Sequence, residues 1–192
     1  MKPSDTNPGE ESGGGHSTAS TLSGPHNDGD VGNELRHALR GLAGSLVLIA
    51  AADGNGRRAV MSATSANALT MAPPAMLFCI NRGVSTYPVI EEAERFSINI
   101  LGRDHLELAQ LCGGRRQGED RFALGSWLCD DHGVPYLCGA QSSLICIKER
   151  AIHFGTHDVV FGLVQTVMRR NDIDPLLYLD GGYRAIGMLL NP

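Results

Sequence analysis

Two long runs of alternating apolar and polar residues, 142–155 and 157–170, most restrict what this chain can fold into. They read SSLICIKERAIHFG and HDVVFGLVQTVMRR and meet at the short sequence FGTHD. Alternation with a period of two is typical of β-strands with one buried face, and a short polar connection between two such runs predicts a hairpin. The sequence therefore predicts one long antiparallel hairpin.

Further strands and three helices are predicted around this hairpin. The other strand-like segments lie at 45–53, 57–64, 75–82, 95–101 and, as a shorter pair, 175–187. The helical patterns lie at 34–43, 85–94 and 104–114. Because strands outnumber helices, we expect a mainly β fold: an antiparallel, closed or nearly closed barrel with a few helices at its ends. The long apolar strands also indicate burial on both faces, for which dimerisation is an expected cause.

Residues 1–33 differ in composition from the rest of the 192-residue chain. They contain seven glycines and no aromatic residue, so they cannot bury enough apolar surface to offset the loss of chain entropy. We expect a disordered tail at 1–33 and a single domain at 34–192. The segment also has neither the charged start nor the apolar run of a signal peptide, which favours a cytoplasmic location.

The charge balance excludes several classes of partner. The net charge is −5, and −4 of it falls in residues 1–33, which leaves about −1 for the predicted domain. A nearly neutral domain lacks the basic surface that nucleic acid requires, and the longest clean apolar runs are too short to span a bilayer. The five cysteines are an odd number at irregular spacings, which indicates reduced thiols in a cytosolic protein. We therefore expect neither nucleic acid nor membrane as a partner.

One stretch between two predicted core strands has an unusual composition. Residues 62–74 read SATSANALTMAPP, with four hydroxyls and an amide among mostly small side chains. If the strands at 57–63 and 75–82 are neighbours, this stretch lies close to the sequence CINRGVST at 79–86, and hydroxyls, an arginine and a helix start together suit a phosphate. The side chains concerned are Ser62, Thr64, Ser65, Asn67, Arg82, Ser85 and Thr86. Composition alone favours an ordinary polar loop.

Other candidate sites are weaker. Zinc-ligand residue types occur at Cys129, His132, Cys138, His153 and His157. Histidines four apart share a face only on a helix, and here two of them flank a glycine at a strand end, so we expect no metal. There is no GxSxG nucleophile motif and neither of the glycine-rich phosphate motifs. The pair His157 and Asp158 begins a strand, where a histidine can donate to a substrate; a turn histidine bonded to backbone is an equal alternative.

Taken in chain order, these pieces resemble the short-chain flavin reductase family, the FMN-binding split-barrel reductases that serve two-component flavin monooxygenases. The matching segments are SATSANALTMAPPAMLFCINRGVSTYPVI, FSINIL, DRFA, a single W, GVPYLCGAQSSLICI, GTHDVVFGLV and PLLYLDGGYRAIG. They occur in the family's order and spacing over about residues 35–187. The resemblance implies a six-stranded antiparallel split barrel with Greek-key connectivity, and a homodimer with flavin near the subunit interface.

The resemblance also implies a set of site residues. The segment that runs along the flavin corresponds to Ser62, Ala63, Thr64, Ser65, Ala66 and Asn67. The segment that wraps the other side corresponds to Cys79, Ile80, Asn81, Arg82, Ser85 and Thr86, the last three near the phosphate. His157 is implied as the catalytic residue beside the flavin and nicotinamide rings, and Tyr183 as a further neighbour. The family usually has Gly-x-Thr where this chain has Val60-Met61-Ser62, so flavin affinity or the choice of flavin is expected to differ.

The function that the resemblance implies is NAD(P)H:flavin oxidoreductase. Hydride passes from NADH or NADPH to FMN or FAD, and the reduced flavin diffuses to a separate monooxygenase that hydroxylates an aromatic compound. Two alternatives stay open. One is a split-barrel flavoprotein with tightly bound FMN that reduces another acceptor, such as a corrinoid or a ferric chelate. The other is a non-catalytic flavin- or haem-binding protein. The sequence does not choose between the two flavins or the two nicotinamides.

Overall fold

The computed structural model describes residues 28–115 and 118–187. Most of the predicted tail, residues 1–27, lies outside this part of the chain. Helix α1 (Asp28–Leu39) replaces the predicted helix at 34–43 and begins within the segment predicted as tail. The chain divides into two compact units at Arg36 and His37, and the barrel belongs to the second.

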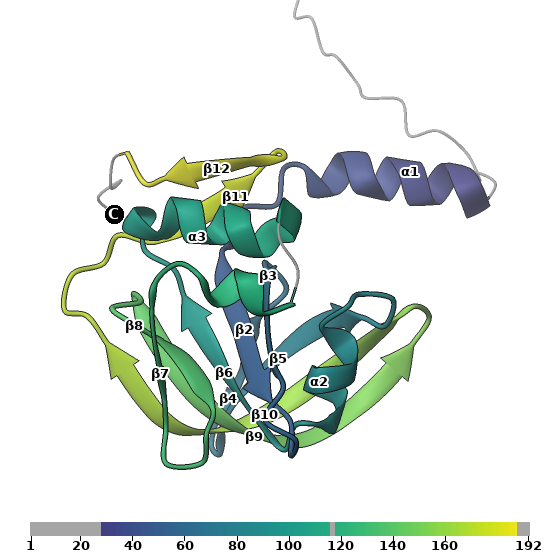
Figure 1. The fold of residues 1–192 in the computed structure, drawn as a ribbon. Helices are drawn as coiled ribbons and strands as arrows, with labels where there is room; N and C mark the ends of the chain where they lie inside the picture. Colours follow the sequence, from purple (N-terminus) through teal and green to yellow (C-terminus); the bar gives the residue numbers. More distant parts are fainter. Residues whose placement is uncertain (1–27, 116–117, 188–192) are drawn as a thin grey trace, which may run out of the picture. The chain divides into compact units, whose positions relative to one another are not determined.

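Seven antiparallel strands form the main sheet of the second unit (Figure 1). They are β2 (Val47–Ala52), β3 (Arg58–Ala63), β4 (Asn67–Met71), β5 (Pro74–Asn81), β6 (Arg95–Ile100), β9 (Ser142–Phe154) and β10 (His157–Arg169). Their order is β3-β2-β6-β9-β10-β5-β4. The predicted long hairpin is confirmed as β9 and β10, which close on the pair Phe154 and His157. The seventh strand, β4, lies in the stretch whose composition favours a loop.

The sheet curls because its two edge strands are consecutive in the chain. Only three residues, 64–66, connect β3 to β4, although these strands occupy opposite edges of the sheet. Three connecting residues reach at most about 14 Å, so the edges must come close together. Since β3 and β4 do not pair with each other, the barrel stays open along one side. The predicted antiparallel split barrel is thus confirmed.

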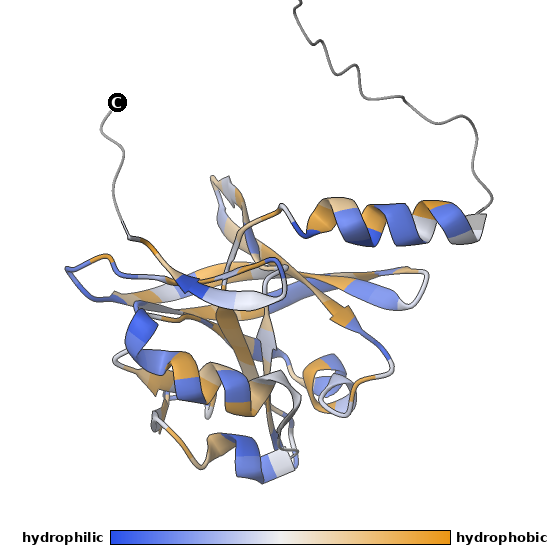
Figure 2. Ribbon diagram, turned by 90° about the horizontal axis from the view of Figure 1, so that it is seen from above, coloured by the Kyte–Doolittle hydropathy of each residue, from blue (hydrophilic) through white to orange (hydrophobic). Residues whose placement is uncertain are grey.

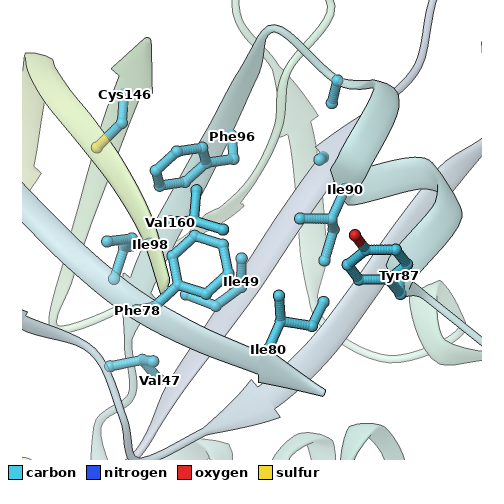
Figure 3. Packing of buried hydrophobic residues seen from close by; sticks show 12 residues of the cluster. Val47, Ile49, Phe78, Ile80, Tyr87, Ile90, Phe96, Ile98, Cys146 and Val160 are labelled. Carbon is cyan, nitrogen blue, oxygen red and sulfur yellow. The ribbon is translucent and has the colours of Figure 1, made fainter. Parts of the chain in front are cut away.

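The barrel is filled by apolar side chains from both of its halves (Figure 3). Phe78 of β5 and Phe96 of β6 meet edge to face, with ring centroids 5.1 Å apart. Gly162 of β10 faces this pair, and a Cβ there would overlap the ring of Phe96. Figure 2 shows the apolar residues concentrated along the strands. The buried members of this cluster are Val47, Ile49, Ala51, Phe78, Ile80, Tyr87, Ile90, Ala93, Phe96, Ile98, Cys146 and Val160.

Shorter elements surround the barrel. Helix α2 (Tyr87–Glu92) buries Tyr87, Val89 and Ile90, and its proline occupies the first turn, as predicted. The predicted helix at 104–114 is divided into η1 (Arg103–His105), α3 (Leu106–Gln110) and η2 (Leu111–Arg115). The remaining elements are β1 (Gly44–Ser45), η3 (Gly118–Phe122), β7 (Ser126–Cys129), β8 (Pro135–Cys138), β11 (Leu176–Leu179) and β12 (Gly182–Ala185).

A buried polar network attaches the β7–β8 hairpin to the barrel. The side chain of Asn99 is fully buried, and its Nδ2 donates to Leu48 O at 3.1 Å and to Ser97 Oγ at 2.8 Å. Its Oδ1 accepts from Leu137 N and from Ser143 Oγ, both at 2.8 Å. One amide therefore satisfies groups on β2, β6, β8 and β9. Buried polar groups are costly only when left unpaired, so this network fixes the position of the hairpin.

We predict that Asn99→Leu lowers the free energy of unfolding by roughly 2 to 4 kcal/mol, because it leaves several buried polar groups without partners. Urea denaturation measures the change. The control is Asn171→Leu at an exposed position, which should shift the midpoint little. Equal effects of the two substitutions would show that the network does not stabilise the fold.

Candidate functional site

Several predicted site residues lie near the opening of the barrel, where Ser65 connects its two edges, whereas the predicted residue Ile80 is buried in the core. Ser65 Oγ donates to Cys79 O at 3.0 Å and accepts from Cys79 N at 3.3 Å. Its hydroxyl thus fastens the connection between β3 and β4 to β5, two residues before the end of that strand. The side chain of Asn67 is exposed and donates to Ser65 O at 3.4 Å. The resemblance places Ser65 on the flavin, whereas the structure shows its hydroxyl engaged by backbone.

A polar cavity of about 230 Å³ lies at one end of this opening. Its lining includes Ser62, Ala63, Thr64 and Tyr183, four of the predicted cofactor-binding residues. The other lining residues are Leu46, Gly113 and Tyr178. The rings of Tyr178 and Tyr183 meet edge to face, with centroids 5.5 Å apart. The structure therefore brings the predicted C-terminal tyrosine together with the end of β3, although the two are far apart in the chain.

The outer face of β5 and β10 carries a second group of predicted residues. Phe78 and Ile80 belong to the core, so Cys79 and Asn81 point outward, because neighbouring residues on a strand face opposite sides. His157 pairs with Asn81 in register and shares this outer face. His157 is exposed, and its Nδ1 lies 2.9 Å from Thr156 Oγ1, which orients the ring.

The other side of the β5 end holds the predicted phosphate-binding residues. Arg82 and Ser85 are exposed, whereas Thr86 is only 4% exposed. The Thr86 Oγ1 atom is buried without a hydrogen-bond partner in the part of the chain that the structure describes. The backbone of this segment is held by Asn81, whose Oδ1 accepts from Gly83 N at 2.8 Å. An unpaired buried hydroxyl and an exposed arginine, four residues apart in the chain, are groups that suit a phosphate or ribityl group.

A charged cluster lies directly beneath Arg82. Asp158 Oδ2 accepts from the hydroxyl of Tyr87 at 2.8 Å, and Asp158 Oδ1 lies 3.0 Å from His153 Nδ1. Burial, reinforced by the hydrogen bond to Asp158, raises the pKa of Tyr87 to about 12. The hydrogen bond from Tyr87 outweighs burial and, with that from His153, lowers the pKa of Asp158. At neutral pH Asp158 is therefore ionised and Tyr87 protonated. Asp158 faces away from His157, so these consecutive residues do not act as a pair.

The predicted residues are thus divided: Ser62, Ala63, Thr64 and Tyr183 line the polar cavity, whereas the residues at 79–86 and His157 lie at or near the end of β5. The outer face that Cys79, Asn81 and His157 share is open to the ring of a ligand. Among the described residues, no three histidine, cysteine or acidic side chains converge as a metal site requires. None of the helices in 28–115 and 118–187 has the length and apolar character needed to cross a membrane.

Comparison with known proteins identifies the family. The model of the flavin reductase like domain matches residues 39–187. This chain belongs to the flavin reductase like family. The match covers the barrel and all the predicted site residues, from Ser62 to Tyr183, and lies within the predicted domain at 34–192.

Individual relatives agree with this assignment. An FMN reductase (NADH), RutF, of Pseudomonas syringae pv. syringae is 36% identical over 152 residues, which cover 79% of this chain and 85% of the relative. Nitrilotriacetate monooxygenase component B from Mycobacterium thermoresistibile has a similar structure, with a TM-score of 0.75 and 26% identity. The match covers 83% of this chain and 89% of that protein. The structure of a flavin reductase domain protein from Arthrobacter sp. FB24 is also similar, with a TM-score of 0.76 and 26% identity. The match covers 83% of this chain and 98% of the Arthrobacter protein.

Sequence reasoning did not find several residues at the site of this flavin reductase like domain. Gly113 and Tyr178 line the polar cavity, and His153, Tyr87 and Asp158 form the cluster under Arg82. Sequence analysis names His153 and Asp158 only in other roles, as a zinc-ligand residue type and as a partner of His157. The pairing of β9 with β10 sets His153 opposite Asp158, but a β-bulge near Arg150 interrupts the alternation, so the pattern along 142–155 does not show which face His153 occupies. The place of Gly113 and Tyr178 in the polar cavity could not be predicted from the sequence either. The residues that line this cavity come from segments far apart in the chain, and no sequence motif links these segments.

We predict that Ser65→Ala lowers the free energy of unfolding by about 1 to 2 kcal/mol and weakens flavin binding, because the two hydrogen bonds to Cys79 are lost at the barrel opening. Urea denaturation and quenching of flavin fluorescence measure the two effects. Ser126→Ala, at an exposed position on β7, is the matched control. If Ser65→Ala behaves like this control in both measurements, the bond between the strands has no role in closure.

Proposed function

We propose that this protein, an NAD(P)H:flavin oxidoreductase, binds flavin reversibly and passes it in reduced form to a separate flavin-dependent monooxygenase. The openness of the site carries this proposal: Thr64, Asn67, Arg82, Ser85 and His157 are all exposed in the single chain. Such a surface suits a ligand that enters and leaves. The similarity to a protein named as component B of a monooxygenase supports a partner of this class.

The finer parts of the proposal concern the ligands and the assembly. The named FMN reductase (NADH) relative favours FMN and NADH as the physiological pair. An aromatic substrate for the partner oxygenase rests on the family resemblance alone. We also propose a cytoplasmic homodimer in which a second copy covers part of the outer face of β5, β10 and β9. The apolar side chains exposed there, Ile152 and Phe154, support a covered face.

The residues of this chain act mainly by holding and orienting ligands. When bound together, the nicotinamide supplies a hydride and the flavin accepts it, so the difficult chemistry belongs to the ligands. The small side chains at 62–67 allow a flat ring to approach the backbone. Arg82, Ser85 and Thr86 bind the phosphate, and the exposed imidazole of His157 orients the nicotinamide or donates a proton. The fit of the buried, unpaired Thr86 hydroxyl to a polar ligand group supports this arrangement.

We predict that NADH oxidation by the purified protein requires added free FMN or FAD, and that its rate saturates with flavin concentration. Steady-state measurement of NADH absorbance tests this. Turnover that persists after removal of free flavin and responds only to another acceptor, such as a ferric chelate, would favour the tightly bound FMN alternative. Absence of turnover with every flavin and acceptor would indicate a binding protein.

We predict that His157→Ala slows NADH oxidation by up to about 10²-fold at saturating flavin, because the loss of orientation or of one proton transfer has an effect of this size. The exposed residue His132, on the β7–β8 turn, provides the control His132→Ala, which should leave kcat unchanged. Equal rates for wild type and His157→Ala would remove His157 from the site.

A further inference from the structure

We propose that His153 positions Arg82 for contact with the phosphate group of a bound flavin, a role that rests on the function proposed above. His153 lies on β9, on the same face as Asp158 of β10, and β10 separates it from the end of β5 that carries Arg82. It is not one of the residues that the family resemblance implies as flavin contacts. The evidence is the geometry between the two side chains and the way in which the imidazole is held.

The guanidinium of Arg82 lies over the face of the His153 ring. Arg82 Nη1 is 3.4 Å from His153 Nδ1 and 3.3 Å from His153 Nε2. If Nη1 lay in the plane of the imidazole at equal distances from Nδ1 and Nε2, it would overlap the ring carbon Cε1, which lies between these two nitrogens. The nearly equal distances therefore place Nη1 above the ring. The ring of Tyr87 is a second aromatic neighbour, 5.9 Å from Arg82 Cζ. Aromatic faces attract a guanidinium without using its charge in an ion pair.

The imidazole is itself held in place from below. His153 Nδ1 donates to Asp158 Oδ1 at 3.0 Å, and Asp158 Oδ2 is held by the hydroxyl of Tyr87. The same hydroxyl lies 2.8 Å from Glu91 Oε1. The hydrogen bond fixes the orientation of a ring that is otherwise 54% exposed. Two strands and helix α2 thus combine to hold one imidazole face toward Arg82.

The position of Arg82 points to a phosphate as its ligand. Arg82 stays exposed while it packs on His153, so it keeps N–H donors available to solvent. Thr86, four residues further along the chain, has a buried hydroxyl without a partner in the described part of the chain. The guanidinium of Arg82 packs on aromatic rings and keeps its N–H groups available, and the hydroxyl of Thr86 lacks a partner. Both groups suit the terminal phosphate of FMN.

The test compares the binding of FMN with that of riboflavin, which has the same ring system but no phosphate. His153→Ala removes the imidazole face and should weaken FMN binding by about 10-fold, with riboflavin binding changed by less than about 2-fold. His153→Phe keeps an aromatic face without a charge and should restore FMN affinity to within about 3-fold of wild type. His132→Ala, an exposed histidine outside the site, is the control. Flavin fluorescence quenching and thermal denaturation follow binding and folding without turnover.

Each outcome separates the possible roles of His153. If His153→Phe binds FMN as weakly as His153→Ala, the histidine acts by its charge or its hydrogen bonds, and the positioning role is wrong. If both substitutions weaken riboflavin and FMN equally, His153 only supports the local fold, which also overturns the proposal. If wild type binds neither flavin, the proposed flavin reductase function fails instead.

Discussion

The fold depends most on the closure of the sheet between β3 and β4. Their three-residue connection forces opposite edges of a seven-stranded sheet together, and Ser65 fixes the connection by two hydrogen bonds to the backbone of Cys79. Because the two edge strands do not pair, the barrel has an opening instead of a continuous wall. The predicted flavin-binding residues at 62–67 lie along this opening. The same constraint therefore shapes the barrel and exposes the surface on which ligands are proposed to bind.

The sequence predicts an element of the fold when its pattern lies within one continuous segment, and it does not when the element depends on contacts with distant segments. The hairpin of β9 and β10 was predictable because 142–155 and 157–170 are two long strand-like runs joined by a short polar connection, although two bulges interrupt their pairing. Strand β4 was not, because its residues are mostly exposed, the apolar Leu69 and Met71 included, and pairing with β5 alone makes them a strand. The hairpin of β7 and β8 also escaped prediction. Its attachment through the amide of Asn99 involves elements that are distant in the chain.

The candidate site was predictable only where a family motif runs continuously along the chain. The segments 62–67 and 79–86 are such motifs, and the structure places both at the opening of the barrel. Composition could not assign a role to Ser65, whose hydroxyl donates a hydrogen bond to the backbone carbonyl of Cys79. Nor could it show that Asp158 turns away from His157 and toward Tyr87, since this depends on which face of β10 packs against α2. Side-chain direction on a paired strand is a tertiary property, and single-sequence patterns define it only when neighbours are known.

At the end of β5, residues proposed to contact the flavin ring and the arginine proposed to contact its phosphate lie on opposite faces of the sheet. Outward-facing Asn81 and His157 lie where a flat ring can rest, while Arg82 contacts His153 and Tyr87 of the charged cluster. If the proposed site is correct, substitutions around that cluster change which phosphate-bearing ligand is accepted while the surface proposed for hydride transfer stays intact. Such a division would separate the choice of ligand from the residues nearest the reacting atoms.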